Sequence, residues 1–181
     1  MSISFCKITK RLQIRSYRDI DNNDVFQLFT NPQVNSFLGA SQFFSNHMFI
    51  KQFLKQVSTN NRESDAWLLF SIFYKLNHQL IGSCGLKIDR KNKEAEIFYL
   101  FLPAYWNKGL ATEACKSIID EIISHINLKR IKALILPENL HAQRVAEKIG
   151  FRFIKEITID RYEQKVQVQL WTFSLITGNY S

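Results

Sequence analysis

The segment 94–136 constrains the fold more than any other part of the chain. It predicts a strand over 94–102 ended by Pro103, a long helix over 109–126, and a strand over 129–136 ended by Pro137. The helix is the clearest element, because its Ile, Leu, Ala and Cys side chains recur at i, i+1, i+4 and i+5 and form one broad apolar stripe. A strand–helix–strand connection joins parallel neighbours by a right-handed crossover. We therefore expect a parallel β-α-β unit.

The flanking segments predict further helices and antiparallel strands. Helices are expected over 19–30, ended by Asn31-Pro32, over about 46–57, and between a cap at Asn139 and a stop at Gly150. Strands are expected over 12–16, 67–74, 80–86, about 151–159 and 167–175, with turns at Asn77-His78 and over 89–93. The predicted fold is a mixed, mostly antiparallel α/β sheet with one parallel crossover and helices on both faces.

The composition is that of a globular protein. The chain has 181 residues, of which 46% are apolar and 22% charged, so we expect one domain over residues 1–181 with a substantial core. Its three cysteines form no CxxC pair and leave one over, which favours neither a disulfide framework nor a metal site. The beginning of the chain lacks the apolar core of a signal peptide, and the uncharged stretch 166–181 is too polar to span a membrane. We expect a cytoplasmic location and no membrane or metal binding.

The formal net charge of +8 is spread over both halves of the chain and forms no basic run. A solvated basic surface accounts for this distribution without any function. Two functional interpretations also remain open: attraction of an anionic cofactor, and weak contact with nucleic acid. We expect no stable nucleic-acid binding.

The short loop between the strand at 94–102 and the long helix has the features of an anion site. The first turn of a helix leaves backbone N–H groups unpaired, and together with the helix dipole they attract negative charge. Gly109 allows close approach of the backbone, Ala111 keeps the first turn small, and Lys108 adds a positive charge. Neither a P-loop nor a dinucleotide fingerprint is present, so the loop taken alone favours a simple helix entry over an anion site.

Four stretches together are more specific. They read TKRLQIR over 9–15, LIGSCGL over 80–86, AEIFYLFLPAYWNKGLATEA over 95–114, and PENLHAQRVAEKIGF over 137–151. In their order and spacing they resemble the GNAT superfamily of N-acetyltransferases, and in particular its branch that acetylates the N-termini of ribosomal proteins. The resemblance extends from about Lys10 to Leu175.

The resemblance implies that acetyl-coenzyme A is the co-substrate. The family's phosphate loop maps to the stretch WNKGLA, so the backbone of Asn107, Lys108, Gly109, Leu110, Ala111 and Thr112 is expected to hold the pyrophosphate. The strand end at Leu100, Phe101 and Leu102 is expected to hydrogen-bond the pantetheine arm as an added strand would. The Asn139 side chain is expected on the same arm, and Arg144 either faces the cofactor's phosphates or is an ordinary surface charge.

The resemblance also gives a candidate base. Glu96 lies at the position of the family's Ala-Glu-Ile and is expected to take the proton from the acceptor amine directly or through water; the alternative is a strand carboxylate paired with lysine. The general acid is where this chain departs from the family, because the usual Tyr and Ser positions are Ala146 and Ala142. His141, Tyr99, Tyr105 and Tyr162 are the other candidates.

We therefore predict an N-acetyltransferase whose acceptor is a primary amine, with a protein N-terminus as the first choice. A small amine (a polyamine, an aminoglycoside or an amino-sugar) is the alternative acceptor, and a non-catalytic acetyl-coenzyme A-binding module is the alternative function. One wall of the acceptor cleft is expected from segment 19–57, with a Phe-rich face formed by Phe37, Phe43, Phe44, Phe49 and Phe53. The sequence leaves monomer and homodimer open.

Overall fold

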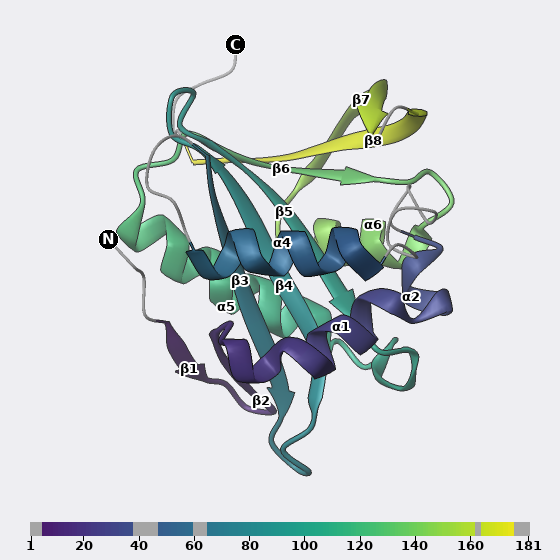
Figure 1. Cartoon of the computed structure of the whole chain (residues 1–181). Helices are drawn as coiled ribbons and strands as arrows, with labels where there is room; N and C mark the ends of the chain where they lie inside the picture. The colour runs from purple at the N-terminus through teal and green to yellow at the C-terminus, as the bar shows by residue number, and fades with distance from the viewer. Residues whose placement is uncertain (1–4, 38–46, 60–64, 162–163, 176–181) are drawn as a thin grey trace.

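A twisted sheet runs through the computed structural model, which describes residues 5–37, 47–59, 65–161 and 164–175 (Figure 1). Within these residues the sheet has 8 strands in the order β1-β2-β3-β4-β5-β6-β8-β7, and only β5 and β6 are parallel neighbours. The strands are β1 (Cys6–Ile8), β2 (Leu12–Ser16), β3 (Asp65–Tyr74), β4 (Leu80–Asp89), β5 (Glu94–Phe101), β6 (Arg130–Ile135), β7 (Arg152–Arg161) and β8 (Gln164–Ser174). The mostly antiparallel sheet with one parallel crossover is confirmed.

Helices cover both faces of the sheet, as expected (Figure 1). They are η1 (Asp19–Asp21), α1 (Asn22–Thr30), α2 (Pro32–Asn35), α4 (His47–Thr59), η2 (Pro103–Tyr105), α5 (Leu110–His125) and α6 (Leu140–Lys148). One apolar core lies between the sheet and α5, where Ile118 and Ile122 are fully buried. A second core lies against α1 and α4, around Phe29 and Ile50. No helix among the described residues has the length and apolar character needed to cross a lipid bilayer.

Two local features differ from the sequence-based expectations. Asn31 and Pro32 end the first helix, but they also begin α2, because the Asn31 side chain accepts from the N–H groups of Gln33 and Val34 and Pro32 occupies the first turn. The strand β1 was not predicted, since its three residues are too few to show an alternating pattern. It pairs with β2 and brings the turn between these strands beside α5.

The ends of α6 follow the expected capping. The Asn139 Oδ1 accepts from the N–H of Ala142 at 3.1 Å, which satisfies one unpaired donor of the first turn. At the other end Gly150 has φ +95°, and the N–H of Phe151 donates to the Ala146 carbonyl at 2.9 Å. This left-handed Schellman stop sends the chain directly into β7 and fixes α6 against the sheet.

Candidate active site

The strands β5 and β6 are paired only over their first residues and then separate. Their parallel pairing covers only Glu94–Glu96 on β5 and Arg130–Lys132 on β6. Both strands then run on, to Phe101 and Ile135, and Figure 1 shows them diverging. A cavity of about 410 Å³ lies along this opening, lined by β5, β6, the loop before α5, the first turn of α5, and α6. The divergence exposes strand-edge backbone groups that a closed sheet would pair.

The register of β4 and β5 decides which of these backbone groups face the cavity. The N–H of Leu102 donates to the Ile81 carbonyl at 2.9 Å, and Leu100 lies two residues before it, so both direct their backbone groups toward β4. The backbone of Phe101 points the other way, toward the opening. Its carbonyl accepts from the indole Nε1 of Trp106 at 2.6 Å, so its N–H is the group directed at the cavity. Leu100 and Phe101 line the cavity, whereas Leu102 is not among its lining residues.

The loop before α5 contains two left-handed residues in close succession. Asn107 has φ +59° and Gly109 has φ +72°, and α5 begins at the next residue, Leu110. A Cβ on Gly109 would meet the Arg11 Nη2 at 3.6 Å, an ordinary contact, so it is the positive φ that requires glycine here. The loop and first turn line the cavity through Asn107, Gly109, Leu110, Ala111 and Thr112. The free N–H groups of this helix start therefore face the same space as β5.

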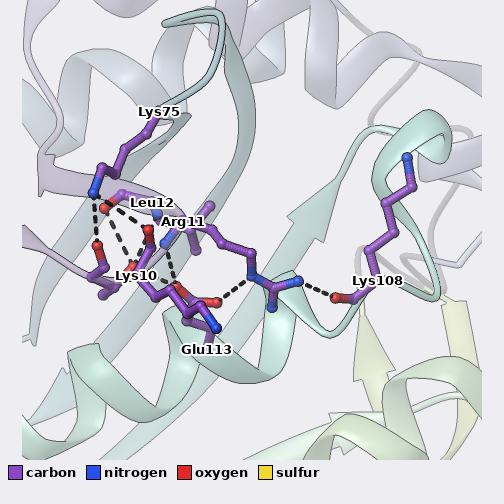
Figure 2. Close-up of polar contacts among 7 residues, drawn as sticks. Lys10, Arg11, Leu12, Lys75, Lys108 and Glu113 are labelled. Atoms are coloured by element: carbon purple, nitrogen blue, oxygen red, sulfur yellow. Dashed lines mark hydrogen bonds and ion pairs between the residues drawn. The ribbon is translucent and has the colours of Figure 1, made fainter.

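Lys108 is the exception within this loop. Its side chain lies over the Tyr105 ring, with Nζ 5.5 Å from the ring centroid, and it is not among the cavity-lining residues. Its carbonyl accepts from the guanidinium of Arg11, as Figure 2 shows. The Lys108 carbonyl is therefore held by Arg11, and the Lys108 ammonium lies outside the cavity.

The helix α6 and its N-cap close the opposite side. Asn139 and Arg144 line the cavity, and so do His141 and Lys148. The cap at the start of α6 uses the Asn139 oxygen, so its amide Nδ2 is the group that can donate to a ligand. Arg144 is exposed at the cavity rim.

Glu96 lies at the end of the cavity where β5 and β6 are still paired. It is half-buried and lines the cavity. It shares a strand face with Phe98, whose ring packs against Phe53 of α4, so Glu96 points to the α1 and α4 side of the sheet. Its direct neighbours in register are Lys87 on β4 and Lys132 on β6. Glu96 thus lies in cross-strand register between two lysines.

Ala146 and Ala142, which stand where the family usually has Tyr and Ser, pack against the core. Ala146 is 1% exposed and belongs to the core beneath α6. Tyr99 of β5 donates its hydroxyl to the Ala142 carbonyl at 2.8 Å, which joins β5 to the first turn of α6. Burial raises the pKa of Tyr99 well above its usual value, so this hydroxyl keeps its proton. The Tyr105 hydroxyl bonds Gln79 in the β3–β4 turn.

His141 is the remaining described candidate for proton transfer. It is exposed on the first turn of α6, and its ring centroid lies 6.3 Å from that of Trp106. It lines the cavity together with Trp106. Tyr162 lies outside the described residues.

Several cavity residues had no clear signal in the sequence. Val34 of α2 lines the cavity, and so do residues 133–135 of β6, because the strand divergence is a tertiary feature that no local pattern predicts. Of the expected aromatic wall, Phe37 lines the cavity and Phe53 packs against Trp67 and Phe98. Phe43 and Phe44 lie outside the described residues.

Comparisons with known proteins identify the family and the fold. The acetyltransferase (GNAT) domain profile matches residues 11–152. The uncharacterized N-acetyltransferase p20 of Bacillus licheniformis is 29% identical over 176 residues, which cover 96% of this chain and 97% of that protein. Its name identifies an N-acetyltransferase but no acceptor.

Two solved structures share the fold. RimL, a ribosomal L7/L12 alpha-N-protein acetyltransferase in complex with coenzyme A, superposes with a TM-score of 0.77 at 14% identity, covering 93% of this chain and 96% of that one. Spermidine N-acetyltransferase from Vibrio cholerae, in complex with coenzyme A and spermine, gives 0.73 at 18% identity, covering 90% and 95%. From the profile match over most of its length, this chain belongs to the GNAT acetyltransferase family.

Proposed function

We propose that this protein transfers the acetyl group of acetyl-coenzyme A to a primary amine, and that the amine is a protein N-terminus. The observation that carries the proposal is the continuous cavity between the diverging β5 and β6, which joins the N-terminal end of α5 to Glu96. One end offers unpaired backbone N–H groups to an anion, and the other offers a carboxylate to an amine. A co-substrate with a pyrophosphate and a long amide-bearing arm fits this arrangement.

Backbone groups bind most of the co-substrate. The loop from Asn107 and the first turn of α5 hold the pyrophosphate, and the edge of β5 hydrogen-bonds the pantetheine arm as an added strand would. A free backbone N–H on the cavity-facing edge of β5 stabilises negative charge on the thioester oxygen. Because these contacts use the backbone, they tolerate variation in the side chains.

Transfer itself forms a C–N bond and breaks a C–S bond. Glu96 accepts a proton from the acceptor amine, directly or through one water, as the nitrogen attacks the thioester carbonyl. The sulfur leaves as the coenzyme A thiolate and takes a proton from His141 or from water, because the Tyr99 proton is committed to the Ala142 carbonyl. Histidine is the side chain best suited to donate a proton near neutral pH.

The charges around Glu96 favour a protein N-terminus over a polyamine. Glu96 is the one carboxylate among the described residues that line the cavity, and two lysines flank it in register. Segment 31–37, which contributes Val34 and Phe37 to the cavity, contains no Asp or Glu. A polycation gains affinity from several carboxylates, whereas a single N-terminal amine needs only one. RimL and the spermidine enzyme illustrate both acceptor classes on this fold.

The test is a coenzyme A-release assay with N-terminal peptides beginning with Ala, Ser and Met, and with spermidine, an aminoglycoside and an amino-sugar as competing acceptors. We expect turnover with peptides, and in Glu96→Gln we expect kcat to fall by about 10²–10⁴-fold. Glu94→Gln is the matched control, since Glu94 lies on the same strand face but pairs with Arg130 outside the cavity. Preference for spermidine would refute the acceptor class, and acetyl-coenzyme A binding without turnover on any acceptor would indicate a non-catalytic module.

A further inference from the structure

Arg11, in the turn between β1 and β2, bridges two parts of the chain that are far apart in sequence (Figure 2). Its Nε donates to the Glu113 Oε2 at 2.7 Å, and its backbone N–H donates to the Glu113 Oε1 at 2.9 Å. Its Nη1 donates to the Lys108 carbonyl at 2.7 Å. One guanidinium thus holds both the first turn of α5 and the loop that precedes it.

The turn that carries Arg11 is itself fixed from two sides. Thr9 donates its hydroxyl to the Glu113 Oε1 at 2.6 Å. Lys75, the residue after β3, donates from Nζ to the carbonyls of Thr9 and Lys10 at 3.2 and 3.3 Å, and its N–H donates to the Arg11 carbonyl. Arg11 therefore acts from a rigid support rather than from a free loop.

Glu113 presents an electrostatic difficulty for anion binding. A carboxylate in the first turn of α5 opposes a phosphate at the same helix end, because like charges repel. Burial would raise the pKa of Glu113, but hydrogen bonds from Thr9 and Arg11 outweigh it and lower that pKa, so the group is ionised. The Arg11 guanidinium, fixed against this carboxylate, offsets its charge at the helix start.

We propose that Arg11 and Glu113 are positioning residues for the phosphate end of the acetyl-coenzyme A site. Arg11 hydrogen-bonds the Lys108 carbonyl and so fixes the conformation of the loop. The left-handed residues on either side, Asn107 and Gly109, then keep the loop's N–H groups directed at the pyrophosphate. It also neutralises Glu113, which in turn holds the guanidinium in place. The inference rests on the proposed function, and it concerns the pyrophosphate alone rather than the thioester or the acceptor.

The test compares a full-length donor with one that lacks the pyrophosphate. In Arg11→Gln we expect KM for acetyl-coenzyme A to rise about tenfold or more, with kcat and the acceptor KM within about twofold of wild type. With S-acetylpantetheine as donor, KM should be the same in the variant and in wild type. Arg11→Lys should fall between wild type and Arg11→Gln for acetyl-coenzyme A, since an ammonium can neutralise Glu113 but lacks the fork that also reaches Lys108.

Lys7→Gln is the control, because it removes one positive charge from β1 and breaks an ion pair to Glu121 of α5, away from the loop. It should leave both donors unaffected, and thermal melts should show all variants folded. Equal KM increases with both donors, or no increase with acetyl-coenzyme A, would overturn the inference while leaving the proposed function standing. Failure of the wild type to use or bind acetyl-coenzyme A would instead overturn the proposed function.

Discussion

Removing the Tyr99 hydroxyl tests whether this group protonates the leaving thiolate. Tyr99→Phe removes one hydrogen bond, from the hydroxyl to the Ala142 carbonyl at 2.8 Å. A neutral hydrogen bond contributes about 1 kcal/mol net, and the Ala142 carbonyl keeps its place in the helical ladder of α6, so we expect a loss of about 1 kcal/mol in unfolding free energy. For a chain of this length, such a loss lowers Tm by about 2–4 °C.

The effect on the rate separates a structural hydroxyl from a general acid. Because burial holds the pKa of Tyr99 well above its usual value and its proton is already donated, we expect kcat to change by no more than about threefold. The assays are urea unfolding followed by circular dichroism and coenzyme A release at saturating donor. If kcat instead fell by about a hundredfold while Tm stayed unchanged, this reasoning would be refuted and Tyr99 would be identified as the proton donor.

Three other predictions concern an ion pair, a close contact and the burial of the cysteines. Asp21→Asn breaks a buried ion pair with Arg15 and should lower the unfolding free energy by about 3 kcal/mol at pH 7. Burial would raise the pKa of Asp21, but hydrogen bonds from Arg15 and its neighbours lower that pKa below its usual value. The difference in unfolding free energy from wild type, measured in urea, should therefore shrink as pH falls from about 5 to about 3. Gly85→Ala places a Cβ 2.2 Å from the Phe98 ring, so the ring must move, unfolding free energy should fall by about 1–3 kcal/mol, and the acceptor KM should rise in steady-state assays. Titration with a thiol reagent should modify Cys6 alone in the native protein and three thiols after denaturation; fast modification of all three in native buffer would contradict the buried placement of the other two.

Local patterns were sufficient to predict most elements of this fold. The apolar stripe of α5, the turn at His78, the cap at Asn139 and the stop at Gly150 each depend on a few neighbouring residues, and the structure places each near its expected position. Most of the predicted site residues line the cavity for the same reason, since the loop and first turn of α5 form one contiguous stretch. Their proposed roles remain predictions.

The rest depends on contacts between distant segments. The divergence of β5 from β6 has no local signature, because β6 keeps its alternating burial to Ile135 and β5 continues as an apolar run after the pairing ends. Arg11 and Glu113 are 102 positions apart, and nothing in either segment alone indicates that one guanidinium joins them. The expected charge of Lys108 inside the site was likewise a local inference, and the structure directs that side chain to Tyr105 instead.

Calorimetric titration with acetyl-coenzyme A tests the central claim most directly, using wild type and Gly109→Gln. Glutamine at φ +72° strains the loop by about 1–2 kcal/mol and adds bulk beside the proposed phosphate cradle, while the sheet is untouched. We predict one binding site per chain in wild type and an affinity at least about tenfold weaker in the folded variant. Equal affinity in the two proteins, or no binding by wild type, would contradict the placement of the co-substrate between the diverging strands.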